Sequence, residues 1–330
     1  MGTFYLSEPH CFVRKESERL KIYKNRSLLR EVRVQEYSRF FIHDSSTLTT
    51  DALMLMAEKG IDVVYFSRNR MVGRFVGPEN RNVRLRIAQV QAHLSEETSL
   101  RIARNLVLAK LKNTRTSLQR FARRKELDFE FVIGSLKQAM KQALQAKDLD
   151  ELRGIEGMAA KRYFEAFPAL IRDSGFSFDG RSRRPAKDPV NALLNYGYAL
   201  LRAELTGALQ AAGLDPYIGF LHRERYGRES LALDVMEEFR SILVDNLVVK
   251  VINQGMIQPD DFTFDLGEPR LKDSARKRFL QAFDRRRKDE VFHHLLQRKM
   301  SYREVFHKQA ILLAKFLKRE MEDYYPFLAK

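Results

Sequence analysis

The chain has 330 residues, of which 44% are hydrophobic, so it can bury the core of one large domain or of two ordinary ones. Lys and Arg number 59 against 43 Asp and Glu, which gives a net charge of +16. The single cysteine, Cys11, excludes an intrachain disulfide framework and a cysteine-rich zinc site.

The excess positive charge is gathered in clusters, which favours a polyanionic partner over the alternative that the charge serves solubility alone. The first residues, MGTFYLSEPH, contain no apolar leader, and no run approaches 18 apolar residues. We therefore expect a soluble cytoplasmic protein that makes no contact with a membrane.

Residues 1–92 are predicted to form a small β-rich domain. Short aromatic or β-branched runs that are cut by turn residues are typical of strands. These runs are FYL, CFVRK, RLKIYK, SLLREVRV, RFFIHD, DVVYFS and MVGRFVG. Before the last two runs, Thr49 or Thr50 can cap a short helix over 51–60, which Gly60 ends.

From about residue 82 the spacing of apolar residues becomes helical, and residues 93–330 are predicted to form a larger, all-helical domain. The helix after Ser95 has a 3.6-residue apolar stripe on Leu100, Ala103, Leu106, Val107, Leu111 and Leu118. Another helix is expected over 126–147, and the segment DFTFDLGEPRLKD is expected to form a hairpin. The predicted fold class is therefore α+β.

Glu156 lies in the segment GIEGMAAKRYF, at a turn that should otherwise face the core. Most glutamates face solvent, and that is one interpretation of this residue. The small residues on either side would also leave room for a cation and a bulky phosphate to approach. The residues alone leave both interpretations open.

Two segments concentrate basic residues. The loop over 172–189 carries Arg181, Arg183, Arg184 and Lys187, and a helix nearer the C-terminus carries Arg276, Arg285 and Arg286. Clusters of Lys and Arg bind phosphates without reading base sequence, so we predict that these residues bind DNA. A solvated charged face is the alternative interpretation.

The helix after this loop contains Asn191 and Asn195 among apolar residues. Their amides are predicted to form hydrogen bonds either across the core or to the active site. Tyr196 and Tyr198 are predicted to lie in the core rather than to contact DNA.

The stretch over 216–240 has the clearest chemical pattern in the chain. A short apolar run leads to His222, and a helical segment then carries Asp234, Glu237 and Glu238 at spacings that share a helix face. Carboxylate oxygens with one imidazole suit Mg²⁺ or Mn²⁺. Glu238 is expected to point off the ligand face, either into a salt bridge or into solvent.

The other six histidines are expected to be structural, and His293, His294 and His307 are expected to lie on basic helices. No Gly-rich phosphate loop is present, so no nucleotide cofactor is implied. No Ser-His-Asp or Cys-His arrangement is present either. Metal-assisted phosphodiester chemistry is therefore the natural interpretation of the pattern around His222.

Several segments together resemble one known family. They are GFLH with SLALDVMEEFR, GIEGMAAKRYF, DPVNALLNYGYALLRAEL, the strand, helix, strand order around GIDVVYFSRNRMVGRF, and Tyr325-Pro326-Phe327 near the end. The chain resembles the CRISPR adaptation integrases, which are the Cas-one family of CRISPR-associated endonucleases. The resemblance extends over nearly all 330 residues.

The resemblance implies a metal site formed by Glu156, His222 and Glu237, with Asp234 in support. It also implies a metal-dependent DNA endonuclease and integrase, in which a 3′-hydroxyl of incoming DNA attacks a phosphodiester of the CRISPR repeat. The expected partners are double-stranded and branched DNA, a second copy of the chain bound through the N-terminal domain, and a small ferredoxin-like protein.

Two other functions remain open from the sequence. The first is a stand-alone nuclease that cuts branched DNA at the same site with water as the nucleophile. The second is a DNA-binding protein without activity, which the presence of all four candidate ligands disfavours.

Overall fold

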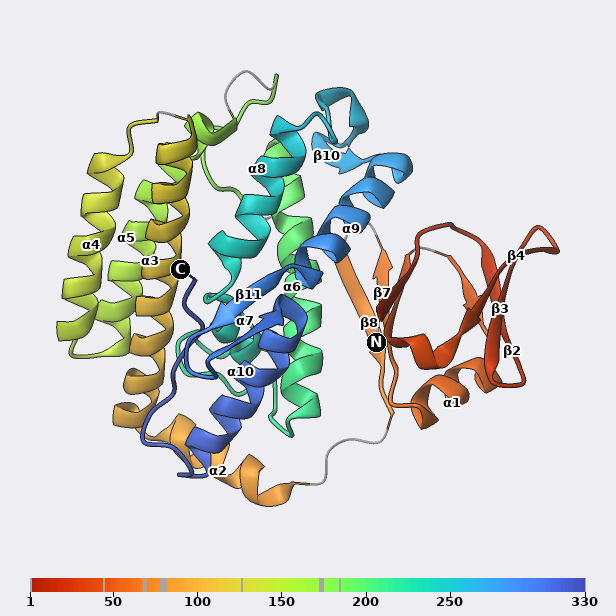
Figure 1. Cartoon of the computed structure of the whole chain (residues 1–330), viewed down its shortest axis with the longest axis horizontal. Helices are drawn as coiled ribbons and strands as arrows, with labels where there is room; N and C mark the ends of the chain where they lie inside the picture. Colours follow the sequence, from red (N-terminus) through yellow and green to blue (C-terminus); the bar gives the residue numbers. More distant parts are fainter. Residues whose placement is uncertain are drawn as a thin grey trace. The chain divides into compact units, whose positions relative to one another are not determined.

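The computed structural model describes residues 2–43, 45–67, 70–77, 82–125, 127–171, 175–183 and 185–329 (Figure 1). The chain divides into two compact units, residues 1–79 and residues 80–330. The domain boundary predicted after residue 92 falls inside helix α2 (Val83–Leu94), which packs on other helices of the second unit. None of the helices in the described ranges combines the length and apolar composition that a membrane span requires.

The first unit is built mainly of strands. They are β1 (Gly2–Leu6), β2 (Cys11–Glu16), β3 (Arg19–Lys24), β4 (Ser27–Arg33), β5 (Tyr37–His43), β6 (Thr47–Leu48), β7 (Asp62–Ser67) and β8 (Arg70–Phe75). Over the described residues, one four-stranded sheet has the order β1-β5-β7-β8 and another has the order β4-β3-β2-β6. The strand runs expected from the sequence are therefore confirmed.

Helix α1 (Thr50–Glu58) connects these sheets and packs on β2 and β7. Its N-cap is Thr49, whose side chain accepts a hydrogen bond from the Ala52 N–H at 3.3 Å, which decides between the two threonines. Gly60 follows the helix with a φ of +65°, a conformation that favours glycine. A short 3₁₀ turn, η1 (Val34–Glu36), precedes β5.

The second unit is mainly helical. Its helices are α2, α3 (Glu96–Lys125), α4 (Glu130–Gln145), α5 (Leu149–Ala166), α6 (Pro189–Ala211), α7 (Ser230–Met236), α8 (Asn246–Asn253), α9 (Asp273–Lys288) and α10 (Tyr302–Leu317). Short helical segments are η2 (Phe167–Ile171), η3 (Arg240–Asp245) and η4 (Pro259–Asp261). Helices α3, α4 and α5 pack side by side (Figure 1).

Helix α6 forms the centre of the second unit, because most of its residues are buried and it packs against α7, α10 and η3. The segment η3, which joins the α7 region to α8, is a π-helix. Wider turns of this kind occur often at functional sites. Helices α3, α5 and α7 and segment η3 together carry the candidate site described below.

The prediction of an α+β fold is confirmed. The second unit is not entirely helical, however, because it contains the hairpins β9–β10 (Phe262–Asp265 and Glu268–Leu271) and β11–β12 (Glu290–His293 and Arg298–Ser301). The first hairpin was expected from the sequence and the second was not. His293 therefore lies in a strand, and the prediction that it belongs to a basic helix is wrong. Helix α9 ends at Lys288, and the strand β11 follows directly.

Gly197→Ala should destabilise the second unit. Gly197 lies on the buried side of α6, where a Cβ would come within 2.6 Å of Val244 Cγ1. Overpacking of this kind costs about 1–3 kcal/mol, and urea unfolding should show a loss of that size. Gly134→Ala on α4 is the control, because a Cβ there meets nothing within 4 Å. Equal stability of the two variants would contradict this account of α6 packing.

Candidate active site

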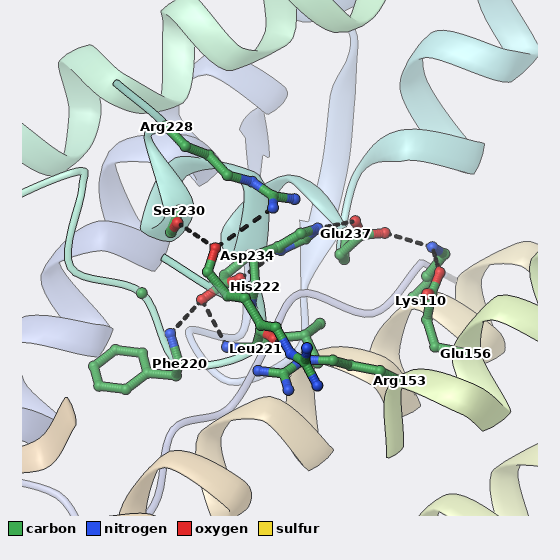
Figure 2. A network of polar contacts seen from close by, with 12 residues as sticks. Lys110, Arg153, Glu156, Phe220, Leu221, His222, Arg228, Ser230, Asp234 and Glu237 are labelled. Carbon is green, nitrogen blue, oxygen red and sulfur yellow. Dashed lines mark hydrogen bonds and ion pairs between the residues drawn. The ribbon is translucent and has the colours of Figure 1, made fainter. Parts of the chain in front are cut away.

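A buried carboxylate holds His222 in place. Asp234, which is fully buried on α7, accepts hydrogen bonds through Oδ2 from the N–H groups of Phe220 at 2.6 Å and Leu221 at 3.0 Å. Its Oδ1 accepts from the His222 N–H at 2.9 Å and from the ring Nδ1 of His222 at 2.6 Å (Figure 2). Because Nδ1 donates its proton to Asp234, the lone pair of the ring lies on Nε2.

Asp234 can approach the loop this closely because residue 219 has no side chain. A Cβ on Gly219 would lie 2.7 Å from Asp234 Oδ2 and 2.8 Å from the backbone carbonyl carbon of Ser230. Glycine permits this close approach of the backbone to the carboxylate. The position of Asp234 therefore requires glycine at residue 219, the first residue of the GFLH segment.

Helix α2 holds the same loop from another side. The side-chain amide of Gln89 donates to the carbonyls of Asp215 at 2.8 Å and Ile218 at 2.9 Å, and its oxygen accepts from the Asp215 N–H at 2.9 Å. One turn later, His93 Nδ1 lies 2.6 Å from the carbonyl oxygen of Gly219. These contacts fix the backbone that leads to His222.

Helix α5 ties the loop to the candidate ligand Glu156. Arg153 Nε donates to the carbonyl of Leu221 at 2.6 Å, and its Nη1 pairs with Asp150 at 2.6 Å. Arg153 lies three residues before Glu156, so the two side chains share one face of the helix. The hydrogen bond to Leu221 therefore fixes the Glu156 helix relative to the loop that carries His222.

Glu237 lies about one helical turn after Asp234 and faces His222. Its Oε1 lies 3.7 Å from His222 Nε2 and 2.9 Å from Arg240 Nε, and its Oε2 lies 2.6 Å from Lys110 Nζ. Glu156 on α5 pairs with the same Lys110 ammonium (Figure 2). Side chains from four separate segments thus meet in one small region.

The charges in this region stabilise one another. Burial acts to raise the pKa of Glu237, but the positive charges of Arg240 and Lys110 outweigh it and lower that pKa to about 2. Burial acts to lower the pKa of Lys110, but Glu156 and Glu237 outweigh it, so the pKa of Lys110 is raised. Glu237 and Lys110 are therefore both charged at neutral pH.

The donor groups suit a divalent cation. Within the described residues, no three His, Cys, Asp or Glu side chains are already arranged as a metal-binding group, and the Lys110 ammonium contacts both Glu156 and Glu237. Two carboxylates nevertheless share this positive charge, and the imidazole Nε2 of His222 lies 3.7 Å from one of them, Glu237. A histidine whose second nitrogen donates to a carboxylate, as His222 does to Asp234, is typical of metal-ligating histidines.

A pocket adjoins this region. Its lining includes Lys110, Tyr163, Phe164, Arg181, Arg183, Tyr198, Arg240 and Asp245. The guanidinium carbons of Arg181 and Arg240 lie 5.3 Å and 4.8 Å from the centroid of the Tyr198 ring, within the range of cation–π contacts. The pocket therefore offers positive charge and aromatic surface directly beside Lys110.

The model of one protein family, described as "CRISPR associated protein Cas1", matches residues 4–285 of the chain. The chain belongs to the Cas1 family.

Curated members of the Cas1 family align along the chain. A CRISPR-associated exonuclease Cas4/endonuclease Cas1 fusion from Geobacter sulfurreducens is 41% identical over 335 residues, which cover 99% of this chain and 60% of that protein. CRISPR-associated endonuclease Cas1 3 from Thermus thermophilus is 37% identical over 335 residues, which cover 100% of this chain and 98% of that protein. The chain therefore spans about 60% of the fusion and nearly the whole of the second relative.

Solved structures also resemble the chain. A casposase bound to integration product has a TM-score of 0.87 at 25% identity, with 98% of this chain and 93% of that chain covered. A chain of a Cas6-RT-Cas1–Cas2 complex has a TM-score of 0.83 at 25% identity, with 99% of this chain and 36% of that chain covered.

The four predicted ligands lie close to one another, but Asp234 has different surroundings from the other three. Glu156 and Glu237 both pair with the Lys110 ammonium, and His222 Nε2 lies 3.7 Å from Glu237 Oε1. Asp234 lies behind His222, and both its carboxylate oxygens accept hydrogen bonds from the loop and the ring. This geometry makes Asp234 a residue that positions His222.

The expectation that Glu238 is solvated or in a salt bridge is wrong. Its side chain is fully buried, and Oε2 accepts from the Phe327 N–H at 2.7 Å and from Gln309 Nε2 at 2.9 Å. Burial raises the pKa of Glu238 to about 8, against hydrogen bonds from Tyr324, Phe327 and Gln309 that act to lower it. The residue does point off the ligand face, and it fastens the C-terminal segment to the core.

The predicted basic residues differ in their surroundings. On the loop, Arg183 and Lys187 are exposed and Arg184 lies outside the described residues. On α9, Arg285 is exposed, Arg286 donates to the Ile242 carbonyl at 2.7 Å, and Arg276 is 6% exposed with an ion pair to Asp273. Arg276 therefore has little surface available for a phosphate.

The two asparagines of α6 organise the basic loop. Asn191 Oδ1 accepts from Arg181 Nη1 at 2.7 Å and from the Ser182 N–H at 2.9 Å, and Asn195 Oδ1 accepts from Arg181 Nη2 at 2.6 Å. The sequence left open whether these amides form hydrogen bonds across the core or to the active site. The contacts favour the second interpretation, because Arg181 lines the pocket. Tyr196 is buried as predicted, and the buried Tyr198 also borders the pocket.

Sequence reasoning missed Lys110, Arg153 and Arg240. A signal for Lys110 was available, because it lies three residues after Val107 on the apolar stripe of α3, where a lysine is out of place. No comparable signal exists for Gln89, whose partners are backbone groups of residues more than a hundred positions later.

Asp245→Asn should change the pH dependence of stability. Burial raises the pKa of Asp245 from its usual 3.8 to about 6, although Tyr198, Tyr163, Arg240 and Arg181 act to lower it. The folded protein thus binds this proton more tightly than the unfolded chain. Asp245 therefore reduces stability as pH rises from about 4 through about 6, by up to about 3 kcal/mol.

The stability of Asp245→Asn relative to the original chain should consequently increase over that pH range, as measured by urea unfolding at several pH values. Asp179→Asn, which removes the same charge at an exposed position, is the control. A pH-independent difference for Asp245→Asn would contradict the assigned shift.

Proposed function

We propose that the chain is a metal-dependent DNA endonuclease and integrase of CRISPR spacer acquisition. The observation that carries the proposal is the meeting of Glu156, Glu237 and His222 Nε2 from separate segments, with Asp234 on the other nitrogen of His222. Membership of the Cas1 family and the likeness to a casposase bound to integration product support it.

Glu156, His222 and Glu237 are the proposed ligands of Mg²⁺ or Mn²⁺, and the imidazole favours Mn²⁺ at least as well as Mg²⁺. When bound, such a cation polarises a phosphate oxygen and stabilises charge on the attacking and leaving oxygens. Asp234 keeps the His222 ring oriented, and Arg153 keeps the loop next to the Glu156 helix. These contacts hold the ligands before the substrate arrives, which lowers the cost of assembling the site.

The choice between water and a DNA hydroxyl as nucleophile depends on positioning. The pocket beside Lys110 carries Arg181, Arg183 and Arg240, which can neutralise DNA phosphates. A DNA end held there reacts at a high effective concentration, which favours a 3′-hydroxyl over water. The Arg181 loop is therefore assigned the task of holding incoming DNA.

The proposed partners are DNA, a second copy of the chain and a small protein of the adaptation complex. The N-terminal β-rich unit, residues 1–79, is assigned to dimerisation, and residues 80–330, which include α2, to catalysis. The likeness to a chain of a Cas6-RT-Cas1–Cas2 complex supports a Cas2-like partner, which we take to be the ferredoxin-like protein. The reaction is assigned to the cytoplasm.

Short duplexes with free 3′-hydroxyls should become covalently joined to a supercoiled plasmid that carries the repeat, given divalent metal and the small partner. Glu156→Ala, His222→Ala and Glu237→Ala should each lower joining by more than about 100-fold, and Asp234→Ala by about 10–100-fold. Joined products are measured on denaturing gels. Glu165→Ala, an exposed acid on the same helix as Glu156, is the matched control and should join DNA normally.

Duplexes that end in 3′-dideoxy nucleotides should not be joined, because they lack the attacking hydroxyl. Equal joining of these duplexes would overturn the integrase assignment. If no DNA is joined but branched DNA is still cut, the chain is instead a stand-alone nuclease that uses water. Normal joining by a folded ligand variant would remove that residue from the proposed metal site.

Replacing Arg183 and Lys187 together with alanine should weaken binding to all duplex sequences. Each lost phosphate contact lowers the slope of log affinity against log salt by about 0.9, so the slope should fall by about 1.8. The slope is measured by fluorescence anisotropy across a salt series. The control replaces Lys137 and Lys141, which are exposed on α4, and removes the same charge. Identical slopes for the two double variants would mean that the loop residues only face solvent.

A further inference from the structure

Lys110 occupies an unusual position for a lysine. Its side chain is 15% exposed, and its ammonium pairs with Glu156 Oε1 and lies 2.6 Å from Glu237 Oε2. Lysine side chains are rarely buried unless they are paired. The partners here are two of the residues proposed as ligands of the divalent cation.

An ammonium group and a divalent cation are attracted to the same oxygens. A cation held by both Glu156 and Glu237 needs the oxygens that Lys110 now contacts. Arg240 and His222 also face Glu237, at 2.9 Å and 3.7 Å from its Oε1. Lys110 differs from these two groups because its ammonium bridges the two carboxylates.

Lys110 also borders a space into which its side chain can turn. It lines the pocket together with Tyr198, Arg181, Arg240 and the Asp245 carboxylate. The lysine stem has four carbons and its head is a compact charge. Aromatic faces attract such a charge at close range. Rotation about the stem can therefore move the ammonium away from Glu156 and Glu237 into the pocket, where the Asp245 carboxylate offsets the positive charge of Arg181 and Arg240.

We propose that Lys110 is an internal counter-ion that competes with the divalent cation. Its ammonium holds Glu156 and Glu237 together in the metal-free protein and turns into the pocket when a cation binds. Metal binding is thereby opposed by a group of the chain itself. The inference rests on the cation site of the proposed function, and it does not depend on which reaction that site performs.

Lys110→Met keeps most of the length of the side chain and removes its charge. Mn²⁺ alone, titrated into the DNA-free chain by calorimetry, should bind this variant about tenfold more tightly or better, because no ammonium must be displaced. In the presence of a chelator, the variant should melt at a lower temperature than the original chain, since the two carboxylates lose their shared partner. Mn²⁺ should then raise its melting temperature by more.

Lys112→Met is the matched control, because it removes the same charge from an exposed position two residues further along α3. This variant should bind Mn²⁺ and melt like the original chain. A Lys110→Met protein with native circular dichroism and equal or weaker Mn²⁺ affinity would overturn the proposal.

If Lys110→Met does not fold, Lys110→Gln takes its place, because glutamine is neutral and can still donate to both carboxylates. Tighter Mn²⁺ binding by this variant supports the competition, and equal or weaker binding overturns it. These measurements use no DNA. A failure of the joining experiment therefore leaves their outcome intact, and the two proposals can fail separately.

Discussion

The buried negative charge of Asp234 is the constraint on which the candidate site depends. An unpaired carboxylate in the interior is costly, by several kcal/mol after relaxation, so the chain must surround it with donors. The loop over 219–222 does so with its backbone N–H groups and the His222 ring. The absence of a side chain at Gly219 and the orientation of the imidazole both follow from this one requirement.

Around Asp234 and His222, positively and negatively charged side chains alternate in a small volume. Glu156 and Glu237 are balanced by Lys110, and Glu237 also by Arg240, which in turn stacks on Tyr198. Each charged group is held by at least one partner of opposite sign, so the side chains are ordered before any ligand arrives. The π-helical segment η3 contributes to this order, because Arg240 and Asp245 at its two ends both line the pocket.

Much of the fold could be predicted from local patterns in the sequence, whereas Glu156 was assigned as a ligand only through the family resemblance. Strand runs, the helix after Ser95 and the spacing of Asp234 and Glu237 all lie within short windows. The buried partners of Glu238 could not be predicted, because Gln309 and Phe327 lie 71 and 89 residues away. The hairpin β11–β12 was also missed, since each of its strands has only four residues, which is too short for a clear alternating pattern.

Helix α2 starts a few residues after the division between the two compact units, and it carries Gln89 and His93. These side chains form hydrogen bonds to the backbone before His222, so α2 is part of the framework that positions the proposed site. A shortened chain that starts at residue 93 would keep every proposed ligand but lose the hydrogen bonds of Gln89 to this loop. A chimaera that takes its N-terminal domain from a relative should therefore join the two sequences before Asn82, so that α2 stays with the second unit. This holds however similar the two sequences are.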